Sequence, residues 1–200
     1  MYNKRMRKIF VVGNIGCGKT TFCKMLEEEL TKLGRAVARL DLDNIALGIA
    51  KNVEIIQQIK DEFGDYKTRE DLARIVFKSK DALDRLNEIT HPYIYEQMLI
   101  NFENYEEMGT DYVIVEETAY QGHEDRFARH ADFLVCVICD EGLRQARCIE
   151  KGMHLVDFAQ RTTLQVPQMS MMEDADIIIN NNNDAVSLRE KVIHFINSFN

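Results

Sequence analysis

The stretch VVGNIGCGKTTF, residues 11–22, decides the fold class of this chain. From Gly13 to Thr20 it follows the pattern Gly-x-x-x-x-Gly-Lys-Thr, which forms a phosphate-binding loop, or P-loop. An apolar run, 8–12, precedes the loop, and leucine, methionine and charged residues follow it at helical spacing over 20–33. The motif requires this order of strand, glycine loop and helix. It predicts a P-loop α/β protein that binds a nucleoside triphosphate.

The residue types in the loop suit a phosphate ligand. Gly13, Gly16 and Gly18 let the backbone curl, so that successive N–H groups point at phosphate oxygens. Lys19 reaches the β- and γ-phosphates, where it also serves catalysis, and the Thr20 hydroxyl ligates Mg²⁺. The expected nucleotide contacts are Gly13, Asn14, Ile15, Gly16, Cys17, Gly18, Lys19, Thr20 and Thr21.

Four further apolar segments, rich in β-branched residues, alternate with helical patterns. They are RAVARLDLD (35–43), DYVIVEE (111–117), DFLVCVICD (132–140) and ADIIINN (175–181). Their length and composition are typical of buried strands. Together with residues 8–12 they predict an α/β fold with a five-stranded parallel sheet flanked by helices. A final amphipathic helix is expected over 184–199.

Two longer helical regions interrupt this alternation. Residues 44–108 show no convincing strand and predict three or four helices, more than a simple crossover needs. We interpret them as a helical insertion on the substrate side, and residues 141–165 as a mobile lid. The chain is then a single domain whose core comprises about 1–43, 109–140 and 174–200.

The composition excludes several classes of function. The 200-residue chain is 46% hydrophobic and has 25 basic and 33 acidic residues, a formal charge of −8, without a basic stripe for nucleic acid. No apolar run approaches the roughly 18–20 residues of a membrane span. The five cysteines lack the spacing of a disulfide framework or a metal site. We expect a soluble cytoplasmic protein with buried thiols and a small-molecule substrate, and neither nucleic acid nor membrane as a partner.

Acidic residues at the end of the second expected strand indicate what happens to the triphosphate. The sequence LDLD places Asp41 and Asp43 on the same side of that strand, at its carboxyl end, where open α/β sheets bind ligands. A carboxylate there can orient an acceptor hydroxyl and accept its proton, which favours a small-molecule kinase over a GTPase switch or a motor ATPase. The alternative is that both aspartates are turn or cap residues before the next helix.

Six segments, GNIGCGKTTF, LDLDNIA, FGDYKTREDLARIVF, LNEITHP, RTTLQ and ADIIINN, follow one another along the chain. In this order, and at about this spacing, they resemble the dephospho-CoA kinases over nearly the whole sequence. The resemblance implies a fold of the nucleoside-monophosphate-kinase type, with a helical acceptor domain and a lid. It also implies that the chain uses ATP and Mg²⁺ to phosphorylate the ribose 3′-hydroxyl of dephospho-CoA, the last step of CoA synthesis.

The resemblance assigns roles to individual residues. Asp43 resembles the family's catalytic base, and Asp41 would support that base or the metal. Arg69 matches an arginine that contacts an anion near the substrate, although a helix-surface role explains it equally well. The THP sequence, which includes His91, matches a family hallmark near the substrate, and is otherwise typical of a helix start with proline in the first turn. Asn180 matches an asparagine near the nucleotide base.

The end of the third expected strand departs from the family pattern. The family has an acid followed by a proline and two leucines, whereas this chain has Glu116 in the acidic position and Thr118, Ala119 and Tyr120 after it. We place Glu116 with the substrate-binding residues. The departure leaves two alternatives open: a nucleoside or nucleotide kinase of the same fold, and a nucleotide-binding regulator without catalysis. The intact catalytic residues argue against the regulator.

The expected lid departs as well. Where the family has glutamine and then arginine at four-residue steps, this chain has Arg144, Arg147 and Lys151, which share one helix face. Like charges on one face repel one another, so we expect these cations to close over the nucleotide phosphates, with Arg147 acting in catalysis. A solvated surface is the alternative. Arg161 and Gln165 match the family's R-x-x-x-Q, and we expect Arg161 near the substrate.

Overall fold

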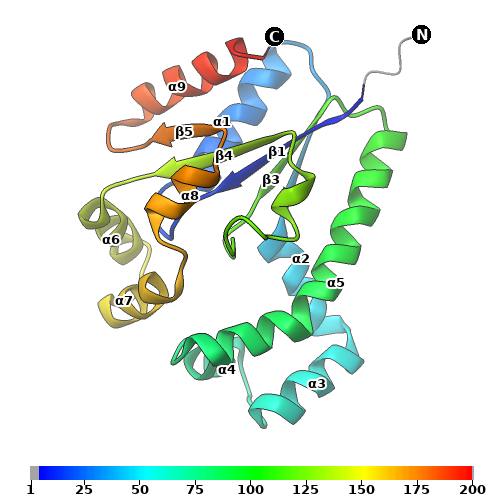
Figure 1. Cartoon of the computed structure of the whole chain (residues 1–200), viewed down its shortest axis with the longest axis vertical. Helices are drawn as coiled ribbons and strands as arrows, with labels where there is room; N and C mark the ends of the chain where they lie inside the picture. Colours follow the sequence, from blue (N-terminus) through cyan, green and yellow to red (C-terminus); the bar gives the residue numbers. More distant parts are fainter. Residues whose placement is uncertain (1–4, 200) are drawn as a thin grey trace.

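The computed structural model describes residues 5–199 and contains a five-stranded parallel sheet in the order β2-β3-β1-β4-β5 (Figure 1). The strands are β1 (Arg7–Val12), β2 (Val37–Asp41), β3 (Tyr112–Glu116), β4 (Phe133–Ile138) and β5 (Ile177–Asn180). Central β1 pairs with β3 on one side and β4 on the other, so the chain order of the strands reverses there. The predicted fold class is confirmed, and this switch point is where open α/β sheets bind ligands.

Helices cover the sheet and fill the two long connections. The α-helices are α1 (Lys19–Lys32), α2 (Leu42–Gly48), α3 (Val53–Phe63), α4 (Arg69–Val76), α5 (Lys80–Glu107), α6 (Glu141–Glu150), α7 (Leu155–Leu164), α8 (Gln168–Asp174) and α9 (Ala185–Asn197). Short 3₁₀ segments are η1 (Ile49–Lys51) and η2 (Ala128–His130). Within residues 5–199, no helix is both long enough and apolar enough to cross a bilayer.

The middle strands β1, β3 and β4 are largely buried on both faces, because successive side chains point to opposite faces and helices cover each face, whereas the edge strands β2 and β5 are partly exposed. In β1, Ile9 and Val11 belong to the core formed with α1 and α9, whereas Phe10 and Val12 belong to the core on the α5 side. Phe10 meets Phe102 of α5 edge to face, with 6.4 Å between the ring centroids. With helices on both faces, the carboxyl ends of the strands are left for ligand binding.

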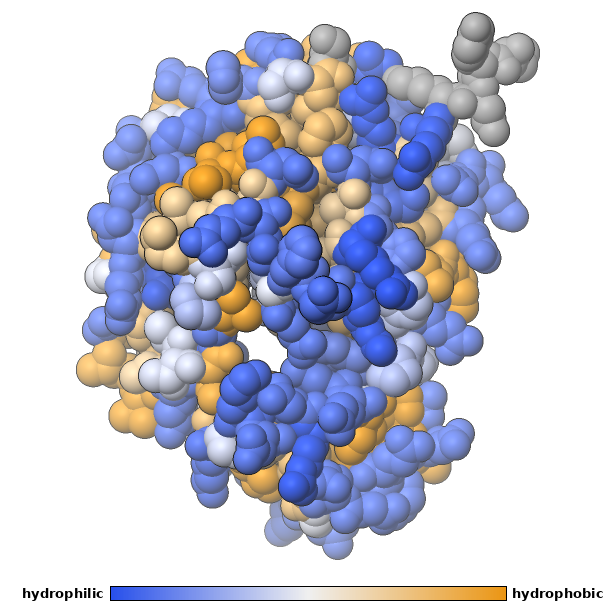
Figure 2. Space-filling view, in the orientation of Figure 1, coloured by the Kyte–Doolittle hydropathy of each residue, from blue (hydrophilic) through white to orange (hydrophobic). Residues whose placement is uncertain are grey.

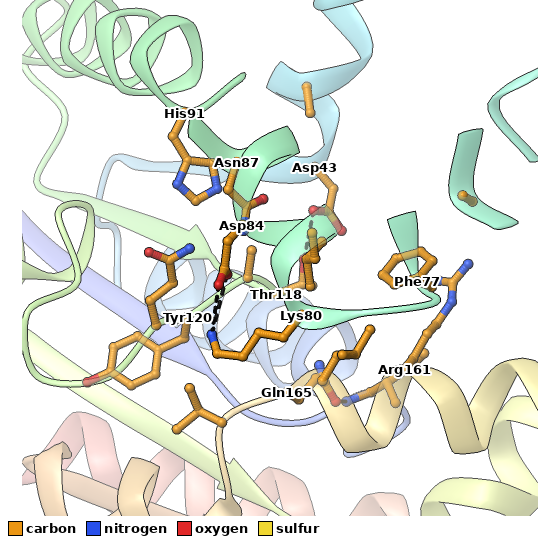
Figure 3. A pocket seen from close by; sticks show the side chains of 18 of the residues that line it. Asp43, Phe77, Lys80, Asp84, Asn87, His91, Thr118, Tyr120, Arg161 and Gln165 are labelled. Carbon is orange, nitrogen blue, oxygen red and sulfur yellow. Dashed lines mark hydrogen bonds and ion pairs between the residues drawn. The ribbon is translucent and has the colours of Figure 1, made fainter. Parts of the chain in front are cut away.

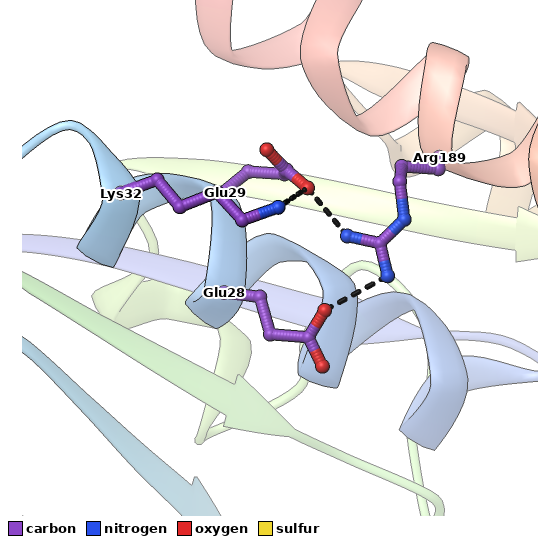
Figure 4. A network of polar contacts seen from close by, with 4 residues as sticks. All are labelled: Glu28, Glu29, Lys32 and Arg189. Carbon is purple, nitrogen blue, oxygen red and sulfur yellow. Dashed lines mark hydrogen bonds and ion pairs between the residues drawn. The ribbon is translucent and has the colours of Figure 1, made fainter.

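A polar network on the surface connects α9 to α1 (Figure 4). Arg189 donates from Nη2 to Glu28 Oε2 at 2.8 Å and from Nη1 to Glu29 Oε1, which also accepts from Lys32 Nζ at 2.8 Å. The hydrogen bonds from Lys32 and Arg189 hold the pKa of Glu29 below its ordinary value. Ion pairs near the surface contribute little individually, so apolar packing carries most of the α1–α9 contact.

The THP sequence lies in the interior of α5 and not at a helix start. The helix begins after Ser79, whose side chain accepts the backbone N–H of Ala82, and Pro92 lies inside it. The expectation of a helix start is therefore wrong. A capped helix tolerates the proline, which removes one hydrogen bond to the carbonyl four residues earlier. The uninterrupted helix leaves the His91 side chain buried.

All five cysteines are buried and free, as the sequence predicts. Cys136 belongs to the core on the α5 side and Cys139 to the core on the α1 side, so the CVIC sequence does not bring its two thiols together. Burial raises the pKa of Cys136 to about 12, which keeps this thiol protonated at neutral pH.

Candidate functional site

Glycines fix the shape of the loop between β1 and α1. Gly13 has a φ of 149°, and a Cβ there would lie 2.3 Å from the carbonyl oxygen of Val137. Gly18 has a φ of 99°, and a Cβ there would lie 2.3 Å from Nδ2 of Asn181. Both positions combine a backbone conformation that side chains rarely adopt with close neighbours. The loop therefore approaches its surroundings closely in front of the α1 N-terminus, where an anion is favoured.

Lys19 begins α1 beside this loop. Its side chain is only 6% exposed, and Nζ donates to the carbonyl of Gly13 at 2.7 Å. The ammonium group is therefore desolvated and lies against the phosphate loop. A buried cation in this position attracts the charge of a triphosphate more strongly than an exposed one.

Thr20 and Glu116 meet between α1 and the end of β3. The Thr20 hydroxyl donates to Glu116 Oε1 at 2.5 Å, while Oε2 has no hydrogen-bond donor among residues 5–199 and lies 3.9 Å from Arg39. Burial raises the pKa of Glu116, although the Thr20 hydrogen bond opposes the shift. A hydroxyl and a carboxylate are hard oxygen ligands, and Mg²⁺ commonly takes its other ligands from phosphate and water. This pair therefore fits Mg²⁺. The sequence predicts Glu116 beside the acceptor, whereas the structure brings it to Thr20.

Side chains from two distant segments, after α7 and after β5, form hydrogen bonds to the main chain of the loop. The backbone N–H of Ile15 donates to Gln165 Oε1 at 2.9 Å, and Nδ2 of Asn181 donates to the carbonyl of Cys17 at 2.8 Å. Asn181 is buried, whereas Asn180 is exposed and its side chain accepts the backbone N–H of Asn182. Asn181, which the sequence pattern did not single out, is therefore the asparagine that reaches the loop.

The three cations of α6 and its C-cap differ in their surroundings. Arg144 is buried, with Nη1 3.4 Å from the carbonyl of Ile15. Arg147 donates from Nη2 to the carbonyl of Asn181 at 3.0 Å and from Nη1 to that of Cys17 at 3.5 Å. Lys151, the C-cap residue, is exposed. Two of the three cations therefore bond to main-chain oxygens in and around the P-loop. These carbonyls, and not only a bound anion, offset the mutual repulsion of the cations.

A cleft of about 1170 Å³ lies beside the loop. Figure 2 shows the molecule hollowed between its upper part, which contains the sheet, and the lower part, which contains α3 and α4. The predicted residues that line it are Ile15, Asp43, Arg69, His91, Arg161 and Gln165. They come from the P-loop, α2, α4, α5 and the α7 region, so the cleft collects segments that are distant in the sequence. Its size suits a ligand at least as large as a nucleotide.

Asp41 and Asp43 have different roles in the structure. β2 ends at Asp41, which caps α2: its Oδ1 accepts the backbone N–H of Asp43 at 2.9 Å. Burial, followed by the charge of Asp43, raises the pKa of Asp41. Asp43 lies in the first turn of α2 and reaches the cleft, where Oδ1 accepts the hydroxyl of Thr118 at 2.7 Å (Figure 3). The expectation that the strand continues to Asp43 is wrong, because Asp41 ends β2 and its side chain caps a helix that begins one residue later; the alternative of a capping role is confirmed for Asp41.

The other predicted acceptor residues surround the cleft. Burial lowers the pKa of His91 to about 4, so its imidazole is neutral at pH 7, and its ring packs against Phe127 with centroids 5.0 Å apart. Arg69 is the exposed first residue of α4. The guanidinium of Arg161 lies 4.6 Å from the ring centroid of Phe77, which follows α4 (Figure 3). Arg69 and Arg161 are therefore the predicted cations that line the cleft.

Several polar residues of the cleft were not singled out from the sequence. They are Lys80, Asp84, Asn87, Gln121 and Arg126; Thr118 and Tyr120 also line the cleft, but the sequence marked them only as departures from the family pattern. Lys80 and Asp84 form an ion pair of 3.2 Å along α5 (Figure 3). The rule that polar residues after parallel strands meet at one edge would have assigned Thr118 and Tyr120 to the site. The helical residues carry no comparable signal, because their charges are also typical of solvated faces.

Comparison with known proteins identifies the family of this chain. The dephospho-CoA kinase family matches residues 8–187. The dephospho-CoA kinase of Aquifex aeolicus is 31% identical over 190 residues, which covers 88% of this chain and 89% of that protein. The dephospho-CoA kinase of Fusobacterium nucleatum is 29% identical over 198 residues, with coverages of 94% and 95%.

Solved structures show the same fold. A crystal structure of a Thermus thermophilus protein superposes with a TM-score of 0.76 at 22% identity, and the match covers 98% of this chain and 100% of that one. The dephospho-CoA kinase from Campylobacter jejuni gives a TM-score of 0.63 at 22% identity, with 97% of each chain covered.

Proposed function

The chain belongs to the dephospho-CoA kinase family, and we propose that it transfers the γ-phosphoryl group of ATP to the ribose 3′-hydroxyl of dephospho-CoA. The products are ADP and CoA, and the proton of the hydroxyl leaves as the new O–P bond forms. The reaction needs a triphosphate site, an acceptor site and a base between them.

One observation supports this proposal most strongly: three adjacent strands deliver the required groups to a single edge. Val11 of β1 pairs with Glu116 of β3, and Glu116 pairs with Asp41 of β2. The P-loop therefore follows β1, the central strand. Glu116, whose carboxylate contacts Thr20, ends the neighbouring strand β3, and Asp43 comes two residues after the end of β2. Parallel register thus brings donor and acceptor groups together.

On the donor side, the loop N–H groups and Lys19 bind the β- and γ-phosphates and stabilise the charge that spreads over the transferring group. Thr20 and Glu116 would hold Mg²⁺, which when bound neutralises phosphate charge. Arg144 and Arg147 hold the loop carbonyls and so support the loop from the α6 side. Lys151 and Asn180 remain proposed contacts of the nucleotide.

On the acceptor side, Asp43 orients the 3′-hydroxyl and accepts its proton. Arg69 and Arg161 line the same cleft and suit the anionic diphosphate of the acceptor. The neutral His91 ring forms part of the cleft wall and supplies shape, not charge.

Two further assignments complete the proposal. Residues 44–108 act as the acceptor-binding part, and residues 141–165 act as a lid that excludes water and so suppresses ATP hydrolysis. Both regions contribute cleft residues, which supports this division. Five free thiols support a reducing, cytoplasmic location.

The test is ADP release with ATP and Mg²⁺ in the presence of dephospho-CoA, adenosine, other nucleosides or nucleoside monophosphates. We expect kcat/KM for dephospho-CoA to exceed that for the other acceptors by on the order of 100-fold. Phosphorus NMR of the product should locate the new phosphate on the 3′-oxygen.

Two results would contradict the proposal. Preference for a nucleoside or its monophosphate would identify a different kinase of the same fold, an alternative that Thr118, Ala119 and Tyr120 keep open. Tight ATP binding without transfer to any acceptor would instead identify a regulator.

A further inference from the structure

Thr118 contacts the proposed base directly. Its hydroxyl donates to Asp43 Oδ1 at 2.7 Å, and Figure 3 shows the two side chains pointing toward one another. The sheet register explains the contact. Asp41 and Glu116 are partners in neighbouring parallel strands, Asp43 comes two residues after Asp41, and Thr118 comes two residues after Glu116. The two chain segments therefore leave the sheet together, and a hydroxyl at position 118 meets the carboxylate at position 43.

The Asp43 carboxylate needs such a partner. The residue is exposed and lies in the first turn of a short helix. Asp41 accepts its backbone N–H, which fixes the main chain but leaves the side chain free to rotate. A base must lie within about 2.6–3.2 Å of the hydroxyl that it orients. A displacement of about 1 Å can cost 100-fold in rate, so the orientation of this carboxylate matters.

Thr118 is anchored well enough to provide that orientation. The backbone N–H of Glu117 donates to the carbonyl of Val11 at 3.0 Å, and the Glu117 side chain is only 1% exposed. The main chain immediately before Thr118 is thus held to β1. A threonine side chain also has restricted rotation about χ1. Its single hydroxyl proton goes to Oδ1 of Asp43, which leaves Oδ2 to accept the proton of the acceptor.

Packing alone does not hold Asp43 in place. A cavity of about 30 Å³, lined by Asp43, Thr118, His91 and Phe127, lies next to the pair. Asp43 is also exposed and lines the large cleft, so neighbouring side chains do not enclose its carboxylate. The bond from Thr118, and not steric confinement, therefore selects the orientation of the carboxylate.

We infer that Thr118 is a positioning residue, which holds Oδ1 of Asp43 and aims Oδ2 at the acceptor hydroxyl. The inference rests on the proposed phosphoryl transfer, in which Asp43 is the base. It adds a residue that acts through Asp43 and touches neither phosphate nor metal.

The test compares Thr118→Val, which keeps the shape of the side chain, with Thr118→Ser, which keeps the hydroxyl. We expect Thr118→Val to lower kcat about 10- to 100-fold, with KM for ATP unchanged, because a hydrogen bond to a charged group is lost. Thr118→Ser should stay within about threefold of the parent chain. Thr31→Val makes the same chemical change at an exposed position of α1 and should have no effect.

A double-mutant cycle separates positioning from direct contact with the acceptor. In an Asp43→Ala background, Thr118→Val should lower the residual rate less than about twofold, because its target is already absent. The inference is overturned if the loss is the same in both backgrounds, if Thr118→Val keeps the parent kcat, or if Thr118→Ser is as slow as Thr118→Val.

Failure of the proposed function remains distinguishable. If the chain phosphorylates another acceptor, the dephospho-CoA assignment fails and the same cycle is measured with that acceptor. If it phosphorylates none, crystal structures decide. Several Asp43 rotamers in Thr118→Val, against one in the parent chain, support the inference, and one unchanged rotamer in both overturns it.

Discussion

The nucleotide side of the cleft is formed mainly by main chain, and the acceptor side mainly by exposed side chains. The nucleotide side, residues 13–20, consists of backbone held by buried polar groups, and Asn14 and Lys19 within it are both buried and hydrogen-bonded. The acceptor side comprises α2, α4 and the beginning of α5. It presents exposed side chains such as Asp43, Arg69 and Lys80, which lie in the first turns of these helices. The first is organised before a ligand arrives, whereas the second relies on a few side-chain contacts.

This difference predicts which kinetic and binding constants a substitution on each side should change. A change on the nucleotide side should affect both ATP binding and turnover, because the same groups hold the phosphates before and during transfer. A change on the acceptor side should leave ATP binding intact and alter turnover or acceptor affinity. The four substitutions below test this separation in order of decreasing effect.

Lys19→Met should have the largest effect. Removing the buried cation beside the loop should lower kcat/KM for ATP on the order of 10⁴-fold, because the ammonium group stabilises the transferring phosphoryl group. Steady-state kinetics with varied ATP measures it, and KM should rise as kcat falls. Lys24→Met, at an exposed position on the same helix, is the control. A loss smaller than tenfold would mean that loop backbone alone stabilises the charge.

Asp43→Asn should lower kcat about 100- to 1000-fold, because the amide cannot accept the acceptor's proton. Isothermal titration should give an ATP dissociation constant within about twofold of the parent value, since Asp43 lies outside the loop. Adding Asn44→Asp to the Asp43→Asn variant moves the carboxylate to the next residue of α2 and should not restore turnover. A variant that retains most of its activity would remove Asp43 from the role of base.

The two sides also differ in how well the sequence predicts them. The P-loop is predictable because its backbone conformation and close neighbours require glycine at positions 13 and 18. These glycines therefore recur at a fixed spacing that can be recognised in the sequence. The strands are predictable because burial on both faces leaves short, apolar, β-branched runs. Neither inference needs knowledge of distant contacts.

The acceptor side is less predictable because it depends on where local elements begin and on what lies opposite them. A pattern that suits an extended strand does not reveal that Asp41 caps a helix. THP looks like a helix start until Ser79 is known to have started α5 earlier. The bond from Thr118 to Asp43 depends on the register of two strands separated by the whole helical region. Such contacts follow from tertiary pairing, which a single sequence does not state.

Arg161→Ala should have an intermediate effect that is confined to the acceptor side. Arg161 extends from α7 and stacks on Phe77 beside α4, so it links the proposed lid to the acceptor side. We expect KM for dephospho-CoA to rise about 5- to 20-fold, with KM for ATP nearly unchanged, because an anion contact and a cation–π contact are lost. Initial rates with each substrate varied in turn measure both constants.

Arg74→Ala provides the matched control for Arg161→Ala. Arg74 is exposed on α4 and pairs with Asp71 within that helix. Its removal should change neither constant. Equal increases of both Michaelis constants in Arg161→Ala would assign Arg161 to the nucleotide side and break the separation.

Glu117→Gln should have the smallest effect and should change stability. Neither carboxyl oxygen of Glu117 forms a hydrogen bond of good geometry within residues 5–199, unlike the bonded Asn14 and Lys19. Burial, followed by the charge of nearby Asp125, raises the pKa of Glu117 well above its ordinary value of 4.5. Above pH 4.5 the unfolded chain loses this proton while the folded chain keeps it, so the free energy of unfolding falls as pH rises.

Replacing Glu117 by glutamine removes that ionisation from the unfolded state. We expect a gain of at least about 1 kcal/mol, or about 2–4 °C in melting temperature, at pH 8, and no gain near pH 4, where both states are protonated. Thermal unfolding followed by circular dichroism across this range measures the difference, with exposed Glu124→Gln as the control. A gain that is the same at both pH values would indicate packing, and no gain at pH 8 would show that the folded protein holds Glu117 ionised. The pH-dependent gain is expected because Glu117 is a buried acid that lies beside another carboxylate, that of Asp125.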